Sequence, residues 1–281
     1  MNDTDDWYYT TGLTDAIDVV STTVARAESR VFVIVGSEQT VLVDTGRGLG
    51  DLRAYLAEHG IHPDRVVLTH AHWDHIGNTH QFETASIHPN ERNADGSLTL
   101  DVVSDVFLTR PQEFVENHLA AGRELPESVD ADTFDIPPVE HVDTHAPGDE
   151  IDLGNRTLEL VDLAGHTGGQ TGVLSRTDGV LLAADLVHID RNVYAHFTDS
   201  SVEDYIAALE RAIDLRDAGA YDVLATAHNE PLTGPDLDLL DRLLDGFHDI
   251  QGGAAPDDTI ETKWGPAREF GVGETLIRVA A

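Results

Sequence analysis

A dense cluster of histidines, placed directly after a buried strand pattern, constrains this chain more than any other feature. Residues 69–78 read THAHWDHIGN, so three His and one Asp fall within six residues after the strand pattern at residues 64–69. Successive side chains of a strand point in opposite directions, so His70 and His72 point the same way. Asp74 and His75 can face the same point from the following turn. Imidazole and carboxylate are the ligands that zinc takes where Cys is absent, and this chain has no Cys. The cluster therefore predicts a metal site.

Three further candidate ligands follow strand patterns later in the chain. His166 lies in the sequence LAGHTGG, Asp185 ends the run LLAAD, and His228 lies in TAHN. Ligands at strand ends share one edge of a sheet, where α/β folds commonly place their sites. Eight other histidines are predicted to be ordinary surface or hydrogen-bonded residues: His59, His62, His80, His88, His118, His141, His145 and His248.

The charge balance limits the partners of the chain. Seventeen Lys and Arg stand against 52 Asp and Glu, which gives a formal net charge of −35. This disfavours a nucleic-acid-binding surface, which needs clustered basic side chains. Lys263 is the only Lys, and this composition resembles that of proteins from halophilic archaea. In molar salt the Debye length is about 3 Å, so crowded carboxylates repel one another little.

Neither a membrane span nor a secretion signal is predicted. The chain has no run of about eighteen apolar residues, and its first residues, MNDTDDWYYTTG, are polar and acidic. We therefore expect a cytoplasmic protein with no membrane partner. A homodimer is left open.

The apolar pattern predicts a layered α/β protein with one domain over residues 1–281. β-branched runs separated by turn residues predict an opening antiparallel sheet, and strands and helices then follow in mixed order. Strands are predicted at residues 16–24, 30–35, 40–43, 64–69, 157–163, 172–174, 180–183, 222–225 and 275–279. Helices are predicted at residues 51–58, 111–121, 202–214 and 237–249. We expect a helical insertion at residues 90–147 and a short helix-strand segment at residues 235–281.

The order of the candidate ligands resembles the metallo-β-lactamase superfamily. The resemblance rests on the motif His-x-His-x-Asp-His at residues 70–75, on residues 165–167 (GHT), and on Asp185 and His228 in that order. Residues 43–46 (VDTG) resemble an early strand-turn motif of the family. The resemblance implies the α/β (α+β) class and an αββα sandwich of two mixed β-sheets flanked by helices.

The resemblance also implies a dinuclear metal site, with two Zn²⁺ expected and Fe or Mn as alternatives. Carried over residue by residue, the first metal would be bound by His70, His72 and His166. The second metal would be bound by Asp74, His75 and His228, and Asp185 would bridge the two. Such a pair can share a water whose pKa falls to about 7, and the resulting hydroxide attacks a carbonyl carbon. Asp44 is expected to accept an N–H from a ligand imidazole, and Thr69 is a weaker candidate for such support.

Substrate contacts are expected from the loop after Asp185, residues 186–197. Arg191 could bind a substrate carboxylate through its guanidinium fork, and Tyr194 or His196 could donate to a carbonyl oxygen. Together with the ligand Asp74, Tyr194 and His196 are therefore the candidate catalytic residues. The insertion is expected to form a lid, in which Phe107, Phe114 and Leu119 either line the pocket or pack as ordinary core.

Several branches of the superfamily can be weighed from these residues. Common β-lactamases of the family use Cys where Asp185 stands, and flavodiiron oxygen reductases have Glu where His72 stands, so both are disfavoured. Glyoxalase II-type thioesterases and lactonases match the ligands best, although the longer helical substrate domain of the former is absent or much reduced. We therefore predict a dinuclear zinc-dependent hydrolase of the glyoxalase II-like or lactonase-like kind, which cleaves a small thioester, ester or lactone. The alternatives are a mononuclear iron persulfide dioxygenase and an RNA-processing or phosphodiester-processing nuclease.

Overall fold

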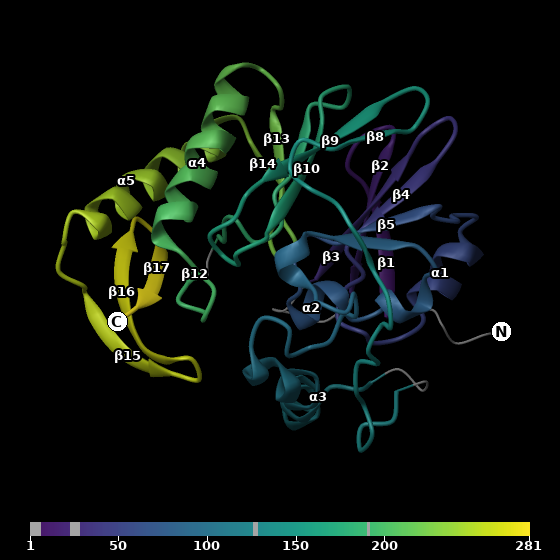
Figure 1. Ribbon diagram of the computed structural model, residues 1–281, viewed down its shortest axis with the longest axis horizontal. Coiled ribbons are helices and arrows are strands. Elements are labelled where there is room, and N and C mark those ends of the chain that lie inside the picture. The colour runs from purple at the N-terminus through teal and green to yellow at the C-terminus, as the bar shows by residue number, and fades with distance from the viewer. Residues whose placement is uncertain (1–6, 23–28, 126–128, 190–191) are drawn as a thin grey trace. The chain divides into compact units, whose positions relative to one another are not determined.

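Two compact units make up the chain in the computed structural model, which describes residues 7–22, 29–125, 129–189 and 192–281. The first unit comprises Met1–His145 and Leu153–Asn155, and the second comprises Ala146–Asp152 and Arg156–Ala281. Each unit contains mixed β-sheet and helices (Figure 1). The single domain over residues 1–281 stays a prediction.

A seven-stranded mixed sheet with the strand order β1 to β7 forms the first unit. Its strands are β1 (Tyr8–Gly12), β2 (Ile17–Thr22), β3 (Arg30–Val35), β4 (Thr40–Val43), β5 (Arg65–Val67), β6 (Ala85–Ile87) and β7 (Asp143–Thr144). β1 to β4 pair antiparallel, as predicted for the opening sheet, and β4 to β7 pair parallel. Parallel pairing places the carboxyl ends of β4 and β5 at the same edge of the sheet, and the VDTG and HAHWDH segments follow these two ends.

Along the chain, the helices of the first unit occur between its strands. α1 (Leu52–Glu58) begins where the Asp51 side chain accepts a hydrogen bond from the Ala54 amide at 2.8 Å. It ends before Gly60, whose φ of +74° is the left-handed conformation that stops a helix. α2 (Trp73–Ile76) is one turn long, and α3 (Arg110–Ala120) lies in the predicted insertion. The 3₁₀ helices are η1 (Thr79–Gln81), η2 (Pro89–Glu91) and η3 (Asp105–Thr109).

A six-stranded mixed sheet with the order β14-β13-β11-β10-β9-β8 belongs to the second unit. Its strands are β8 (Glu150–Asp152), β9 (Thr157–Asp162), β10 (Thr171–Ser175), β11 (Val180–Leu182), β13 (Val223–Ala225) and β14 (Leu232–Thr233). The strands predicted at residues 157–163, 172–174, 180–183 and 222–225 are therefore present. The candidate ligands of this unit follow β9, β11 and β13.

A separate four-stranded sheet, which the sequence pattern did not predict, closes the second unit. It has the order β12-β17-β16-β15, and its strands are β12 (Asn192–Ala195), β15 (Asp258–Thr262), β16 (Gly265–Val272) and β17 (Thr275–Ala280). β17 is the predicted closing strand. β12 lies in the segment expected to be a loop, and it runs parallel to β17.

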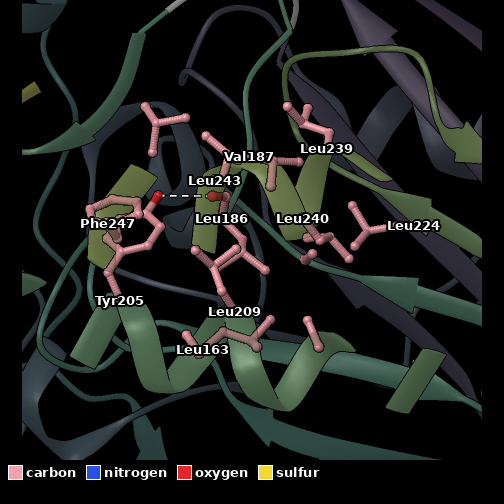
Figure 2. Close-up of a cluster of buried hydrophobic side chains, with 14 of the residues drawn as sticks. Leu163, Leu186, Val187, Tyr205, Leu209, Leu224, Leu239, Leu240, Leu243 and Phe247 are labelled. Carbon is pink, nitrogen blue, oxygen red and sulfur yellow. Dashed lines mark hydrogen bonds between the residues drawn. The ribbon is translucent and has the colours of Figure 1, made fainter. Parts of the chain in front are cut away.

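The core of the second unit is built around α4 (Val202–Asp217) and α5 (Leu239–Gln251), which follows η4 (Gly234–Asp238). Figure 2 shows apolar side chains from both helices around the rings of Tyr205 and Phe247, which stack with centroids 4.5 Å apart. The Tyr205 hydroxyl donates to the carbonyl oxygens of Leu186 (2.9 Å) and Asp185 (3.1 Å). The core therefore holds the backbone of a candidate ligand. Within the described residues, none of the helices has both the length and the apolar character needed to span a membrane.

Candidate metal centre

The first unit brings four of the predicted ligands together just after β5. The His70 ring centroid lies 4.5 Å from that of His72 and 4.0 Å from that of His75. Candidate ligand atoms of Asp74 and His75 lie within 4.8 Å of each other. The three imidazoles are buried, and the Asp74 side chain is 17% exposed. His72 has extended backbone and precedes α2, so the turn of this helix brings Asp74 and His75 back toward His70.

Asp44 holds this cluster from the turn after β4. Its Oδ2 lies 2.7 Å from Nδ1 of His75 and accepts from the Thr69 hydroxyl at 2.8 Å, while its Oδ1 accepts from the Thr69 amide at 2.7 Å. The φ of Asp44 is +62°, a conformation that Asp tolerates better than most residues and that is typical of functional turns. With Nδ1 of His75 directed at Asp44, Nε2 is the nitrogen that can bind a metal.

Thr69 fixes the tautomer of His70 in the same way. Its single hydroxyl hydrogen is donated to Asp44, so the hydroxyl oxygen can only accept at its 3.1 Å contact with Nδ1 of His70. Nδ1 of His70 therefore carries the hydrogen, and Nε2 carries the lone pair. Asp44 and Thr69 thus direct Nε2 of two neighbouring histidines toward ligand binding.

Glu91 is a further residue of this region, and the sequence motifs did not indicate it. It is fully buried in η2, and its Oε2 accepts from the backbone amide of Ala71 at 2.9 Å. Ala71 lies between His70 and His72, so this bond fixes the backbone on which two candidate ligands are carried.

In the second unit, Asp185 lies among three histidines. Its carboxylate oxygens are 3.5 Å from Nε2 of His166, 3.4 Å from Nε2 of His228 and 3.8 Å from Nε2 of His188. The preceding Ala184 has φ +47°, a strained conformation for a residue with a side chain. His188 was not predicted. Its ring stacks on that of His228 at 5.6 Å, and its spacing of three residues from Asp185 is the only local signal for it.

His166 is oriented by backbone contacts. Its Nδ1 lies 2.9 Å from the carbonyl oxygen of Tyr194 in β12 and donates to it, which leaves Nε2 for a metal. Gly165 has φ +143°, and a Cβ there would lie 2.5 Å from Cα of Tyr205 in α4, so only Gly allows this close approach. Tyr194 therefore supports this ligand through its backbone.

The predicted substrate contacts have different outcomes. Arg191 lies outside the described residues. The Tyr194 ring lies under the Arg278 guanidinium at 5.6 Å. His196 is 4% exposed, with its ring near those of Phe197 (4.7 Å) and Trp264 (5.5 Å). Burial, aided by the charge of Arg278 and by His166, lowers the pKa of His196 to about 4. The imidazole is therefore neutral at pH 7, where it can form hydrogen bonds but cannot act as a proton-donating imidazolium.

The three apolar residues of the predicted lid are also placed differently. Phe107 in η3 is buried, and its ring lies 4.4 Å from that of His72. Phe114 in α3 lies 5.6 Å from the Trp73 ring. Leu119 is 43% exposed. Phe107 and Phe114 thus attach the inserted segment to the HAHWDH segment, whereas Leu119 does not pack as core.

Comparison with known families identifies the class of this protein. The sequence model of the metallo-beta-lactamase superfamily matches residues 26–220, and the chain belongs to this superfamily. A metallo-beta-lactamase family protein of Thermus thermophilus, TTHA1429, has a similar structure, with a TM-score of 0.60 and 20% identity over 88% of this chain and 85% of that one. A metallo-beta-lactamase from Pontibacter korlensis gives a TM-score of 0.56, with 16% identity over 86% of this chain and 99% of that one. The predicted fold class, the metallo-β-lactamase fold with mixed sheets flanked by helices, is confirmed.

A human relative adds a named activity. The chain is 28% identical over 241 residues to a Homo sapiens protein named acyl-coenzyme A thioesterase MBLAC2, and the match covers 79% of this chain and 81% of that protein.

The donor sets fit a divalent metal. Each unit concentrates imidazoles and carboxylates, which are ligands of zinc and related ions. His70, His75 and His166 each direct Nδ1 to a protein oxygen, an arrangement typical of metal-binding histidines. Together with the family, these sets support a metal-dependent hydrolase.

Proposed function

We propose that this protein is a metal-dependent thioesterase that cleaves small thioesters, with acyl-coenzyme A thioesters as the first candidates. The observation that carries the proposal is the similarity to acyl-coenzyme A thioesterase MBLAC2 over most of both chains, in a chain whose His and Asp sets fit a divalent metal. Esters and lactones are hydrolysed by the same attack on a carbonyl carbon, so they are tested as substrates as well.

The proposed metals are two Zn²⁺, with the ligands that the family resemblance implies. His70, His72 and His166 would hold one, Asp74, His75 and His228 the other, and Asp185 would serve both. When bound, the metals would supply an activated water and a Lewis acid for the carbonyl oxygen. Cytoplasmic location and a homodimer stay predictions.

The residues around the ligands have defined tasks in this proposal. Asp44, Thr69 and the Tyr194 carbonyl keep Nε2 of the histidines ready to bind. Tyr205 and Gln170 fix the backbone of Asp185, since Gln170 accepts from its amide at 3.3 Å. His196, which is neutral at pH 7, is proposed to donate a hydrogen bond to the substrate, and Arg191 stays the proposed partner of a substrate carboxylate.

A substrate panel with defined metal content tests the proposal. We would offer metal-free and Zn²⁺-loaded protein, in molar KCl, four kinds of substrate: acyl-coenzyme A thioesters, lactones, p-nitrophenyl esters and a phosphodiester. We expect thioesters to be cleaved fastest, chelation to abolish the activity, and Zn²⁺ to restore it. The variants His70→Ala and Asp185→Ala should lose at least about 100-fold in kcat/KM, whereas His248→Ala, at an exposed position of α5, should not.

Other results would assign the protein elsewhere. Faster cleavage of the phosphodiester would indicate the nuclease alternative. One iron per chain, with oxygen uptake on a persulfide and no thioester cleavage, would indicate the dioxygenase. A preference for lactones over thioesters would keep the hydrolase but reject the thioester assignment.

A further inference from the structure

Arg47 is a buried cation beside one of the proposed metal ligands. Its side chain is 4% exposed, and its Nη2 lies 3.7 Å from Oδ2 of Asp74. Its guanidinium carbon lies 5.6 Å from the centroid of the Trp73 ring and 5.2 Å from that of Phe114. Burying a charge is costly unless partners compensate it, and aromatic faces attract cations. Arg47 is therefore held by the two rings as well as by Asp74.

The backbone of Arg47 is fixed against α2. The amide of Gly77 donates to the carbonyl oxygen of Gly46 at 2.8 Å, and the amide of Thr45 donates to the carbonyl oxygen of His75 at 2.7 Å. A Cβ on Gly77 would lie 2.3 Å from the carbonyl carbon of Arg47 and 2.1 Å from the Gly48 nitrogen. This close approach packs the turn that carries Arg47 directly against the helix that carries Asp74. The buried Arg47 side chain therefore lies where it would meet a metal bound by the Asp74 carboxylate.

We propose that Arg47 is a positioning residue that weakens the binding of a divalent metal to Asp74. The proposal rests on the proposed function, because it takes Asp74 to be a metal ligand. A guanidinium stays charged over the working pH range, so Arg47 and the metal share one carboxylate and repel each other. The metal that uses Asp74 therefore binds more weakly than the other, and its occupancy follows the free metal concentration.

Arg47 has two opposing effects on Asp74, and their sizes decide the sign. It orients the carboxylate, which favours metal binding, and it repels the metal. The orientation does not depend on Arg47 alone, because the Asp74 backbone lies in α2 and its carbonyl accepts from the Ser29 hydroxyl at 2.7 Å. Repulsion between a unit charge and a divalent ion at this range corresponds to about tenfold in affinity even at the dielectric constant of water. We expect the repulsion to be the larger of the two effects, because backbone contacts also hold Asp74 in place.

The test is a Zn²⁺ titration of metal-free protein against a chromophoric chelator. Wild-type protein should bind two Zn²⁺ with unequal Kd. Arg47→Met keeps an unbranched side chain about as long as the aliphatic part of Arg and removes the charge. The weaker step should therefore tighten about tenfold, and the stronger step should stay unchanged. Arg47→Lys keeps the charge and should resemble the wild type. Arg65→Met removes a charge from an exposed position of β5 and serves as the matched control.

The outcomes separate this inference from the proposed function, because the titration uses no thioester. The role of Arg47 is overturned, and the proposed function is not, if Arg47→Met leaves the weaker binding step unchanged or weakens it. The same holds if Arg65→Met tightens that step as much as Arg47→Met does. Folded wild-type protein that binds no Zn²⁺ overturns the metal-dependent function and this inference with it. Circular dichroism of each metal-free variant checks folding, and Arg47→Gln, which is also neutral, replaces Arg47→Met if that variant does not fold.

Discussion

At the scale of single residues, Asp44 supports the proposed site without being one of its ligands. Its carboxylate contacts His75 and accepts two hydrogen bonds from Thr69. Asp44→Asn keeps the size of the side chain and the tolerance for φ +62°, but it loses the negative charge that holds the imidazole. We expect Zn²⁺ affinity to fall about 10-fold to 100-fold, measured by chelator competition. Asp51→Asn is the control, since Asn caps α1 as well as Asp does. Equal losses in both variants would show that Asp44 has no specific role.

His196 makes a pH-dependent contribution to stability. Its pKa in the folded protein, about 4, lies below the usual value of 6.5, mainly because of burial. Between these values the unfolded chain binds the proton more readily, so stability is full above pH 6.5 and falls as the pH drops toward 4. This contribution amounts to about 2–3 kcal/mol. We expect His196→Phe to lose that part of the pH dependence in denaturant unfolding, whereas His248→Phe, at an exposed position, should keep it. Identical pH profiles for wild type and His196→Phe would contradict this.

The sequence predicts residues that act through a motif and misses residues that act through contacts. The alternation of a strand is enough to pair His70 with His72, and the turn motif is enough to suggest Asp44. Glu91 supports Ala71 from twenty positions away, and Arg47 contacts Asp74 where the backbone at Gly77 packs against that of Arg47. Such residues carry no local pattern, because their role depends on how distant segments pack.

At the scale of elements, strands with regular apolar runs could be predicted, and in the C-terminal sheet only β17 was among them. β3 and β4 were predicted with the bounds they have, since their residues are almost all buried. β15 is largely exposed, and β16 contains Gly265, Pro266 and Gly271, residues that usually interrupt strands. β16 forms because β15 and β17 pair with it on both sides, which is information that its own sequence lacks.

We also expect the C-terminal sheet to contribute measurably to the free energy of unfolding of the second unit. Ile277 in β17 is fully buried in the core shared with α4 and α5. Ile277→Ala leaves a cavity there and should lower the free energy of unfolding by about 2–4 kcal/mol, measured by denaturant unfolding. Glu261→Ala on the exposed β15 should change it by less than about 0.5 kcal/mol. If both variants were equally stable, this sheet would be peripheral to the folding of the unit.

At the scale of the whole molecule, the charge of −35 lies almost entirely outside the interior. Among the acidic residues in the described part of the chain, Asp44, Glu91 and Asp185 are the buried ones, and each has a specific place near the proposed ligands. The other acidic residues of the described part are partly or fully exposed. In dilute buffer, where the Debye length is about 10 Å, they repel one another and oppose the compact state.

We propose on this basis that the protein is adapted to molar salt. Raising KCl from about 0.1 M to about 2 M shortens the Debye length to about 3 Å or less, which removes most of this repulsion from the folded state. The free energy of unfolding should rise by about 3 kcal/mol, equivalent to roughly 6–12 °C in Tm for a chain of this size, measured by thermal unfolding. Sucrose at equal osmolality stabilises by exclusion without screening charge and is the control. A Tm that ignores KCl, or that rises equally in sucrose, would show that the acidic surface is no adaptation to salt.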